Sequence, residues 1–154
     1  MDIGSVMKRN VVWLNINSTL EEAIEVMIEN RIGLLPLLDE QRELQGFLNL
    51  REILSLAWPT FIEMVENYDF VHNFGVFETS HMSEKFRSKQ VTEFMQLPIS
   101  VTENCGLLRA AAVMKQHRLR DIPVVDAESR LVGLASWVDV GVAFLKEWLS
   151  SEDV

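Results

Sequence analysis

The residues best placed to do chemistry are a hydroxyl and a carboxylate near the end of the chain, Ser136 and Asp139. They follow Gly133 in the order Gly-x-x-Ser-x-x-Asp, where an apolar strand is expected to give way to a helix. A helix N-terminus offers free N–H groups and a positive dipole end, which suit a phosphate. The same spacing is close to a capping box, in which both side chains only begin the helix. Both interpretations remain open at this point.

Other reactive side chains do not form a recognisable catalytic or metal site. His72, His81 and His117 show no metal-ligand spacing. Cys105 is the only cysteine, so no intrachain disulfide is possible. Its place near an expected helix start indicates a small structural residue, not a nucleophile. No enzyme activity is therefore predicted.

Composition limits the classes of partner. The 154 residues are 48% hydrophobic, which predicts a folded core. A net charge of −9 argues against nucleic-acid binding, which needs clustered Lys and Arg, and disfavours anionic lipid. The start of the chain does not resemble a secretory signal, and no apolar run approaches the roughly 20 residues of a membrane span. With a single cysteine, these features predict a cytoplasmic protein without membrane insertion.

These side chains must be positioned by an internal repeat. Sliding the chain over itself by 87 positions aligns residues 17–53 with 104–140 with ten identities and no gap. The identical residues are Asn17/Asn104, Leu20/Leu107, Ala23/Ala110, Val26/Val113, Met27/Met114, Arg31/Arg118, Pro36/Pro123, Asp39/Asp126, Leu44/Leu131 and Gly46/Gly133. A shift of one further residue also pairs Met7 with Met95. The duplication is therefore the main architectural signal.

Each copy is expected to contain a strand, a helix, a hairpin and a second helix. The expected elements of both copies are strands at 11–16 and 99–102, hairpin strands at 34–38 and 44–48, and second helices at 50–57 and 137–150. Ser18 and Glu21 form a capping-box pattern for the first helix. Pro36 predicts an edge strand or one that ends at a bulge, and Gly46 predicts a bulge or a close backbone approach.

One unit of about 50 residues buries too little surface to be stable alone. We therefore expect an α+β, sandwich-like fold of two β-α-β-β-α units with pseudo-twofold symmetry, at 1–57 and 91–150. An insert at 58–90 carries many aromatic residues, with a helix expected at 60–67. It is too apolar for a free linker. We expect it to pack on the module, or to contact a second copy or a partner.

The repeat resembles the CBS domain, named after cystathionine β-synthase. Each copy has an apolar-Pro-apolar-apolar-Asp strand, at 35–39 and 122–126, followed by Leu-x-Gly. The second copy adds the Gly-x-x-Ser-x-x-Asp motif at 133–139. The resemblance implies a module that senses adenine nucleotides and forms homodimers. The insert lies outside it.

The resemblance also implies roles for individual residues. Ser136 would contact a ligand phosphate, and Asp139 would accept hydrogen bonds from the ribose hydroxyls. Ile99 and Ile122 are candidates to sandwich an adenine ring, although core packing is equally expected of them. The implied nucleotide site of the second copy thus comprises Ser136, Asp139, Ile122, Ile99, Ser100, Arg120 and Pro123. Arg120 is at a position that often faces the ligand phosphates in this family. Asp121 beside it could form an ion pair with Arg120 and so weaken that role.

The first copy departs from the family pattern. Asn49 replaces the hydroxyl and Glu52 replaces the Asp, a pair still able to form a capping box. Trp13 stands where the second copy has Ser100, and its ring is large enough to fill the slot. These differences predict that the first site is degenerate.

The leading hypothesis is a regulatory module that binds AMP, ADP or ATP, or S-adenosylmethionine, mainly in the second unit, with no required cofactor. Binding would shift a conformational or dimer equilibrium read by a regulated protein. The alternative is a ligand-free interaction scaffold whose working surface is the aromatic insert.

Overall fold

The computed structural model describes residues 1–57 and 82–150. The first unit consists of β1 (Leu14–Asn15), α1 (Leu20–Asn30), β2 (Leu34–Leu38), β3 (Leu44–Asn49) and α2 (Leu50–Ala57). The second consists of β4 (Val101–Thr102), α5 (Leu107–Gln116), β5 (Asp121–Val125), β6 (Leu131–Ser136) and α6 (Trp137–Ser150). Two short 3-10 helices, η1 (Ile3–Ser5) and η4 (Val91–Glu93), and the short helix α4 (Glu84–Arg87) precede or join the units. The expected α+β fold of two β-α-β-β-α units is confirmed.

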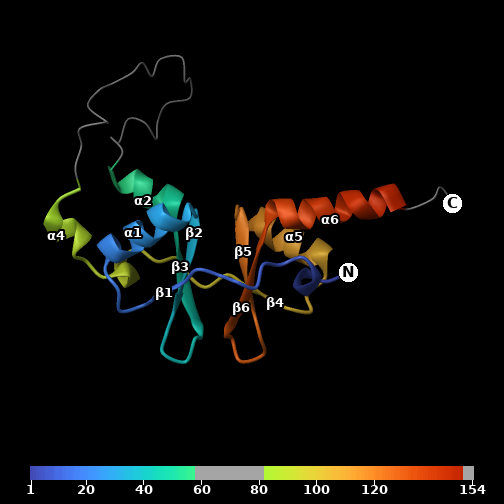
Figure 1. The fold of residues 1–154 in the computed structure, drawn as a ribbon, viewed down its shortest axis with the longest axis horizontal. Helices are drawn as coiled ribbons and strands as arrows, with labels where there is room; N and C mark the ends of the chain where they lie inside the picture. The colour runs from blue at the N-terminus through green and yellow to red at the C-terminus, as the bar shows by residue number, and fades with distance from the viewer. Residues whose placement is uncertain (58–81, 151–154) are drawn as a thin grey trace, which may run out of the picture.

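The two units form separate three-stranded sheets in the orders β1-β2-β3 and β4-β5-β6. Figure 1 shows the sheets side by side, with α1 and α2 flanking one and α5 and α6 flanking the other. Each sheet joins an antiparallel hairpin to a short parallel strand that pairs over only two residues. The first strands are therefore shorter than the predicted 11–16 and 99–102.

Pro36 does not lie on an edge strand, because β2 is the central strand of its sheet. Its cross-strand partner Phe47 directs its own N–H and C=O away from β2, toward Gln96. The missing N–H of Pro36 therefore faces the β1 side, where pairing begins only at Leu37. The strand also has the bulge predicted as the other possibility, between Leu37 and Leu38. A short neighbour thus lets a central strand tolerate proline.

Helix α1 begins one residue later than its sequence pattern indicated. Thr19, not Ser18, is the N-cap: its hydroxyl accepts from the Glu22 N–H at 3.3 Å, and the Glu22 carboxylate accepts from the Thr19 N–H at 2.8 Å. The backbone of Ser18 instead accepts from the Val91 N–H at 3.0 Å. Because Ser18 is held by a segment 73 positions away, the capping box moves by one residue.

Each unit is completed by the segment that leads into the other unit. Lys8, which precedes the first unit, pairs with Leu134 of β6 through two backbone hydrogen bonds of 2.8 and 2.9 Å. Gln96, which precedes the second unit, pairs in the same way with Phe47 of β3, at 3.2 and 2.9 Å. These reciprocal contacts explain the pairing of Met7 with Met95 in the sequence.

The same exchange explains the glycine of each Leu-x-Gly strand. A Cβ added to Gly46 would lie 2.5 Å from the Gln96 carbonyl oxygen and 3.0 Å from the Met95 sulfur. A Cβ on Gly133 would collide with the Met7 side chain. The predicted close backbone approach at Gly46 is confirmed, and the approaching segment is the exchanged one.

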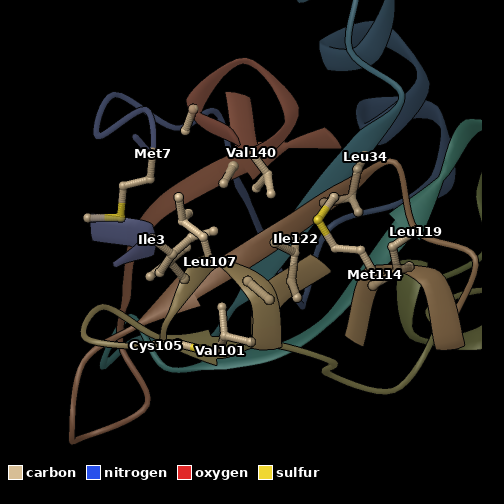
Figure 2. Packing of buried hydrophobic residues seen from close by; sticks show 14 of the residues in the cluster. Ile3, Met7, Leu34, Val101, Cys105, Leu107, Met114, Leu119, Ile122 and Val140 are labelled. Carbon is tan, nitrogen blue, oxygen red and sulfur yellow. The ribbon is translucent and has the colours of Figure 1, made fainter. Parts of the chain in front are cut away.

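The core crosses from one unit to the other. Leu34 of β2 and Phe47 of β3 are buried in a cluster made otherwise of unit-2 residues and the N-terminal Ile3 and Met7. Figure 2 shows Leu34 beside Met114 and close to Leu119. A smaller cluster joins the hairpins through Leu38, Leu44, Val125 and Leu131. The two units are therefore packed against each other by apolar burial.

The expected helix at 60–67 lies outside the described residues, as does most of the aromatic insert. At its described end, Met82 and Phe86 pack against the unit-1 core. The Phe86 ring also contacts Phe94, with centroids 5.3 Å apart. Within 1–57 and 82–150, no helix is long and apolar enough to cross a membrane.

Candidate functional site

Ser136 and Asp139 are held together at the junction of β6 and α6. The Asp139 Oδ2 accepts from the Ser136 N–H at 2.8 Å and from the Ser136 hydroxyl at 2.7 Å. The Ser136 Oγ in turn accepts from the Asp139 N–H at 3.1 Å. The helix cap expected from the sequence is therefore present. Among the described residues no donor reaches Oδ1, which leaves one carboxylate oxygen to meet a ligand.

The equivalent junction of the first unit is built differently. The Asn49 Oδ1 accepts from the Arg51 N–H at 3.0 Å, so Asn49 does cap α2. Glu52 is exposed, and in the described part of the chain it makes no hydrogen bond with Asn49. The capping box expected here is therefore wrong. The Asn49 amide engages the second N–H of the helix rather than the third, and the Glu52 side chain lies in solvent.

Two cavities divide the predicted polar residues of the second site. Asp139 lines a cavity of about 500 Å³ together with Met1, Ser5, Val142 and Lys146. Ser100 lines a different cavity of about 430 Å³, beside Arg109 of α5. The structure thus brings Ser136 and Asp139 together but does not bring Ser100 into the same cavity.

The predicted apolar residues differ in how much surface they offer. Ile122 is fully buried in the main cluster and Pro123 is also buried, opposite Leu134. Ile99 is only partly buried where it packs on that cluster. Of the two residues expected to sandwich an adenine ring, only Ile99 therefore keeps accessible surface in this conformation.

Arg120 is exposed directly before β5, and its carbonyl accepts from the Trp137 N–H at 2.7 Å. This bond ties the residue before β5 to the first residue of α6. No ion pair joins Arg120 to Asp121 among the described residues, contrary to the pairing considered from the sequence. The guanidinium is therefore not held by its neighbour.

Asp121 lies next to Ser136 in the fold, a position that the sequence did not reveal. It is the cross-strand partner of Ser136, and both side chains are partly buried. Burial raises the pKa of Asp121 above its ordinary value, and the negative charge of Asp139 raises it further, while Lys8 and Arg120 oppose the shift. Lys8 reaches this site through its pairing with Leu134. The only sequence signal for that approach was the Met7/Met95 match.

Trp13 of the first unit is 37% exposed, so its ring is not enclosed within the unit. The guanidinium of Arg42 lies over the ring, 5.6 Å from its centroid, in a cation–π arrangement. Within 1–57 and 82–150, no group of three or more His, Cys, Asp or Glu side chains could hold a metal ion.

Known proteins share both the sequence pattern and the fold. The family model described as "CBS domain" matches residues 3–58 and 91–143. The chloroplastic CBS domain-containing protein CBSX1 of Arabidopsis thaliana is 31% identical over 122 residues, which are 76% of this chain and 52% of the relative. This chain thus spans about half the length of that protein. The chain is also similar to part of an enzyme: it is 26% identical to a segment that makes up 22% of the inosine-5′-monophosphate dehydrogenase of Aquifex aeolicus.

Solved structures of the same fold include ligand complexes. The CBS-pair protein CBSX2 of Arabidopsis thaliana superposes with a TM-score of 0.74 at 24% identity, covering 97% of this chain and 98% of that one. CBSX2 has also been solved with AMP (TM-score 0.70, 21% identity, 96% and 98% covered). The CBS domain pair of protein MJ0100 was solved with 5′-methylthioadenosine and S-adenosyl-L-methionine, and a bacterial CNNM/CorC CBS domain with ATP.

Two copies of the same β-α-β-β-α unit, exchanged leading segments and matches to the family model in both copies lead to one conclusion. This chain belongs to the CBS domain family and is a tandem pair of CBS domains.

Proposed function

We propose that this protein is a regulatory module that binds an adenosine-containing ligand mainly in its second unit, beside Ser136 and Asp139. The observation that carries the proposal is the closed set of hydrogen bonds between these two side chains, with one Asp139 oxygen left over. A fixed carboxylate is suited to accept the two hydroxyl hydrogens of a ribose.

The start of α6 suits the phosphate end of such a ligand. The helix has 14 residues and begins directly after Ser136, so the positive end of its dipole lies at this junction. Of its first three N–H groups, those of Trp137 and Asp139 are bonded to Arg120 and Ser136, which leaves that of Val138 to donate to a phosphate. The hydroxyl of Ser136 can rotate to donate to a phosphate oxygen, because Asp139 still accepts from the Ser136 N–H. Structural neighbours solved with AMP, ATP and S-adenosyl-L-methionine support the class of ligand.

We propose that the first unit does not share this site. Asn49 and Glu52 form no equivalent pair in the described part of the chain, and the Glu52 side chain lies in solvent. One ligand per chain is therefore expected. A thermal-shift series with AMP, ADP, ATP and S-adenosylmethionine at millimolar concentration tests the proposal, since a ligand that binds only the folded state raises Tm. Folded protein with no rise in Tm for any of them contradicts it.

The exposed face of α6 supports a role in assembly, which we propose to be a homodimer. Val138, Trp148 and Leu149 are 68%, 69% and 90% exposed, although all are large and apolar. Apolar groups gathered on a surface mark an interaction site, and a symmetric pair is the commonest closed assembly. Because α6 begins directly after Ser136 and carries Asp139 in its first turn, ligand binding and assembly would share one element. Light scattering with and without AMP measures this coupling.

Self-association alone would fit the second candidate, an interaction module that needs no ligand. The same exposed residues of α6 favour it. The thermal-shift series separates the two functions, because only the regulatory module is stabilised by an adenosine ligand.

A further inference from the structure

Asp121 lies beside the proposed ligand site, and the proposed function gives its carboxylate no role. Asp121, the first residue of β5, is the cross-strand partner of Ser136, the last residue of β6. Directly opposed residues of an antiparallel pair have Cβ atoms about 5 Å apart on one face of the sheet. A phosphate held by Ser136 would therefore lie next to the Asp121 side chain.

Two cations and a second carboxylate complete the surroundings of Asp121. Lys8 lies along the outer edge of β6, where its backbone pairs with Leu134. Arg120 directly precedes β5, and Asp139 is bonded to Ser136. All three are close enough to Asp121 to influence its pKa. The two positive and two negative charges balance before any ligand arrives.

The fold does not require these charges. At the equivalent positions the first unit has Gln96 for Lys8, Gly33 for Arg120 and Leu34 for Asp121. Leu34 is 4% exposed and packs in the main core cluster. The repeat therefore accepts a buried apolar side chain where the second unit has a half-buried carboxylate, whose burial is unfavourable.

We propose that Asp121 sets the charge selectivity of the second site, so that it takes adenosine ligands without a polyphosphate chain and disfavours ATP. This inference rests on the proposed function, because it assumes an adenosine ligand beside Ser136 and Asp139. Lys8 and Arg120 are the cations that act on Asp121, and they only balance its charge and that of Asp139. The further cation of the cavity, Lys146, lies about two helical turns beyond Asp139 on α6, away from the Asp121 end. Each added phosphate adds repulsion from Asp121.

Isothermal titration calorimetry with adenosine, AMP and ATP, in the absence of divalent cations, tests the selectivity. Asp121→Asn removes the charge with little change in shape, and Asp121→Leu installs the side chain of the first unit. Glu128→Gln is the matched control, because it removes one negative charge from an exposed residue at the far end of the hairpin. Circular dichroism verifies that each variant folds.

Either Asp121 variant is expected to lower the Kd for ATP by about tenfold, because the Asp121 carboxylate and the phosphates would be close together and repel each other. The Kd for AMP should fall less, and the Kd for adenosine should stay the same. Glu128→Gln should leave the ratio of the ATP and AMP constants unchanged. An unchanged ratio in folded Asp121→Asn and Asp121→Leu overturns the charge selectivity alone. Failure of every ligand to bind the wild-type protein overturns the proposed function and this inference with it.

Discussion

Lys8 and Leu134 are paired through their backbones in both directions, with N···O distances of 2.8 and 2.9 Å. The beginning of the chain thus closes the outer edge of the second unit's sheet, 126 positions along the sequence. The equivalent pairing of Gln96 with Phe47 closes the first unit. Each unit is completed by a segment that belongs to the other half of the chain, so the two halves are expected to unfold together.

The contribution of the edge pairing can be separated from that of the Lys8 side chain by comparing two variants that both lack this side chain. Lys8→Pro eliminates the N–H that bonds to the Leu134 carbonyl, whereas Lys8→Ala keeps it. We expect Lys8→Pro to lower the free energy of unfolding by about 1–3 kcal/mol relative to Lys8→Ala, because a backbone acceptor loses its partner. Urea unfolding followed by circular dichroism measures the difference. Equal stability of the two variants would show that the pairing contributes nothing.

The two strand glycines are predicted to differ in their tolerance of a methyl group. The Cβ of Gly46→Ala meets the carbonyl oxygen of Gln96, which belongs to the paired backbone and cannot move alone. The Cβ of Gly133→Ala meets the Met7 side chain, which is flexible and can shift. We expect Gly46→Ala to destabilise the protein by about 1–3 kcal/mol, and Gly133→Ala by less. Thermal unfolding of both variants checks the order, and the reverse order contradicts this packing.

The pKa of Asp121 predicts a pH-dependent stability change. Burial raises this pKa above its ordinary value of 3.8, so above the raised value the folded state carries an unfavourable charge. Asp121→Asn should therefore raise Tm at pH 7. The gain should shrink as pH falls through the raised pKa and disappear below about 3.8, where wild-type Asp121 is protonated in both states. A gain independent of pH would contradict the electrostatic cause.

Asp126 is expected to behave in the opposite way. Desolvation alone would raise its pKa, but hydrogen bonds from Arg130 and from the Glu128 N–H hold the pKa below its ordinary value. Asp126 thus contributes stability above its unfolded pKa, which is lost as pH falls through the folded one. Asp126→Asn should lower Tm at pH 7 and have less effect near pH 3. A rise in Tm for Asp126→Asn at pH 7 would contradict this assignment, just as a fall for Asp121→Asn would contradict the one above.

The exposed end of α6 predicts the effect of a charge on assembly. Trp148→Glu should weaken the homodimer by at least tenfold, since an apolar contact would be replaced by a buried charge. Leu97→Glu is a suitable control, because Leu97 is also highly exposed but lies in the loop before β4. Sedimentation at several concentrations measures the dissociation constant. Equal association of both variants would place the interface elsewhere.

Local sequence patterns were sufficient for most of the fold. The second helices at 50–57 and 137–150 have the bounds that were predicted for them. Features set by distant segments were not predictable. Thr19 rather than Ser18 caps α1, and the Ser18 carbonyl instead accepts a hydrogen bond from the distant Val91 N–H. Pro36 is tolerated in a central strand because the short β1 does not extend as far as this residue.

In the candidate site, too, residues close together in the sequence were predictable, and residues brought in by distant segments were not. Ser136 and Asp139 are three residues apart, and the sequence placed both at the start of α6. Asp121 meets Ser136 through the hairpin register, and Lys8 arrives from a segment that pairs by exchange. Ile122 has a motif position but is fully buried. A motif therefore names the residues near a site, while packing decides which of them a ligand can reach.

Calorimetric titration of AMP into the wild-type protein, Asp139→Ala and Glu52→Ala tests the central claim most directly. Glu52 is the repeat equivalent of Asp139 and lies in solvent, so it is a matched control. We predict about one AMP per wild-type chain, an affinity at least tenfold weaker in folded Asp139→Ala, and an unchanged affinity in Glu52→Ala. Unchanged binding by Asp139→Ala, or a loss confined to Glu52→Ala, would contradict the assignment of the site to the second unit.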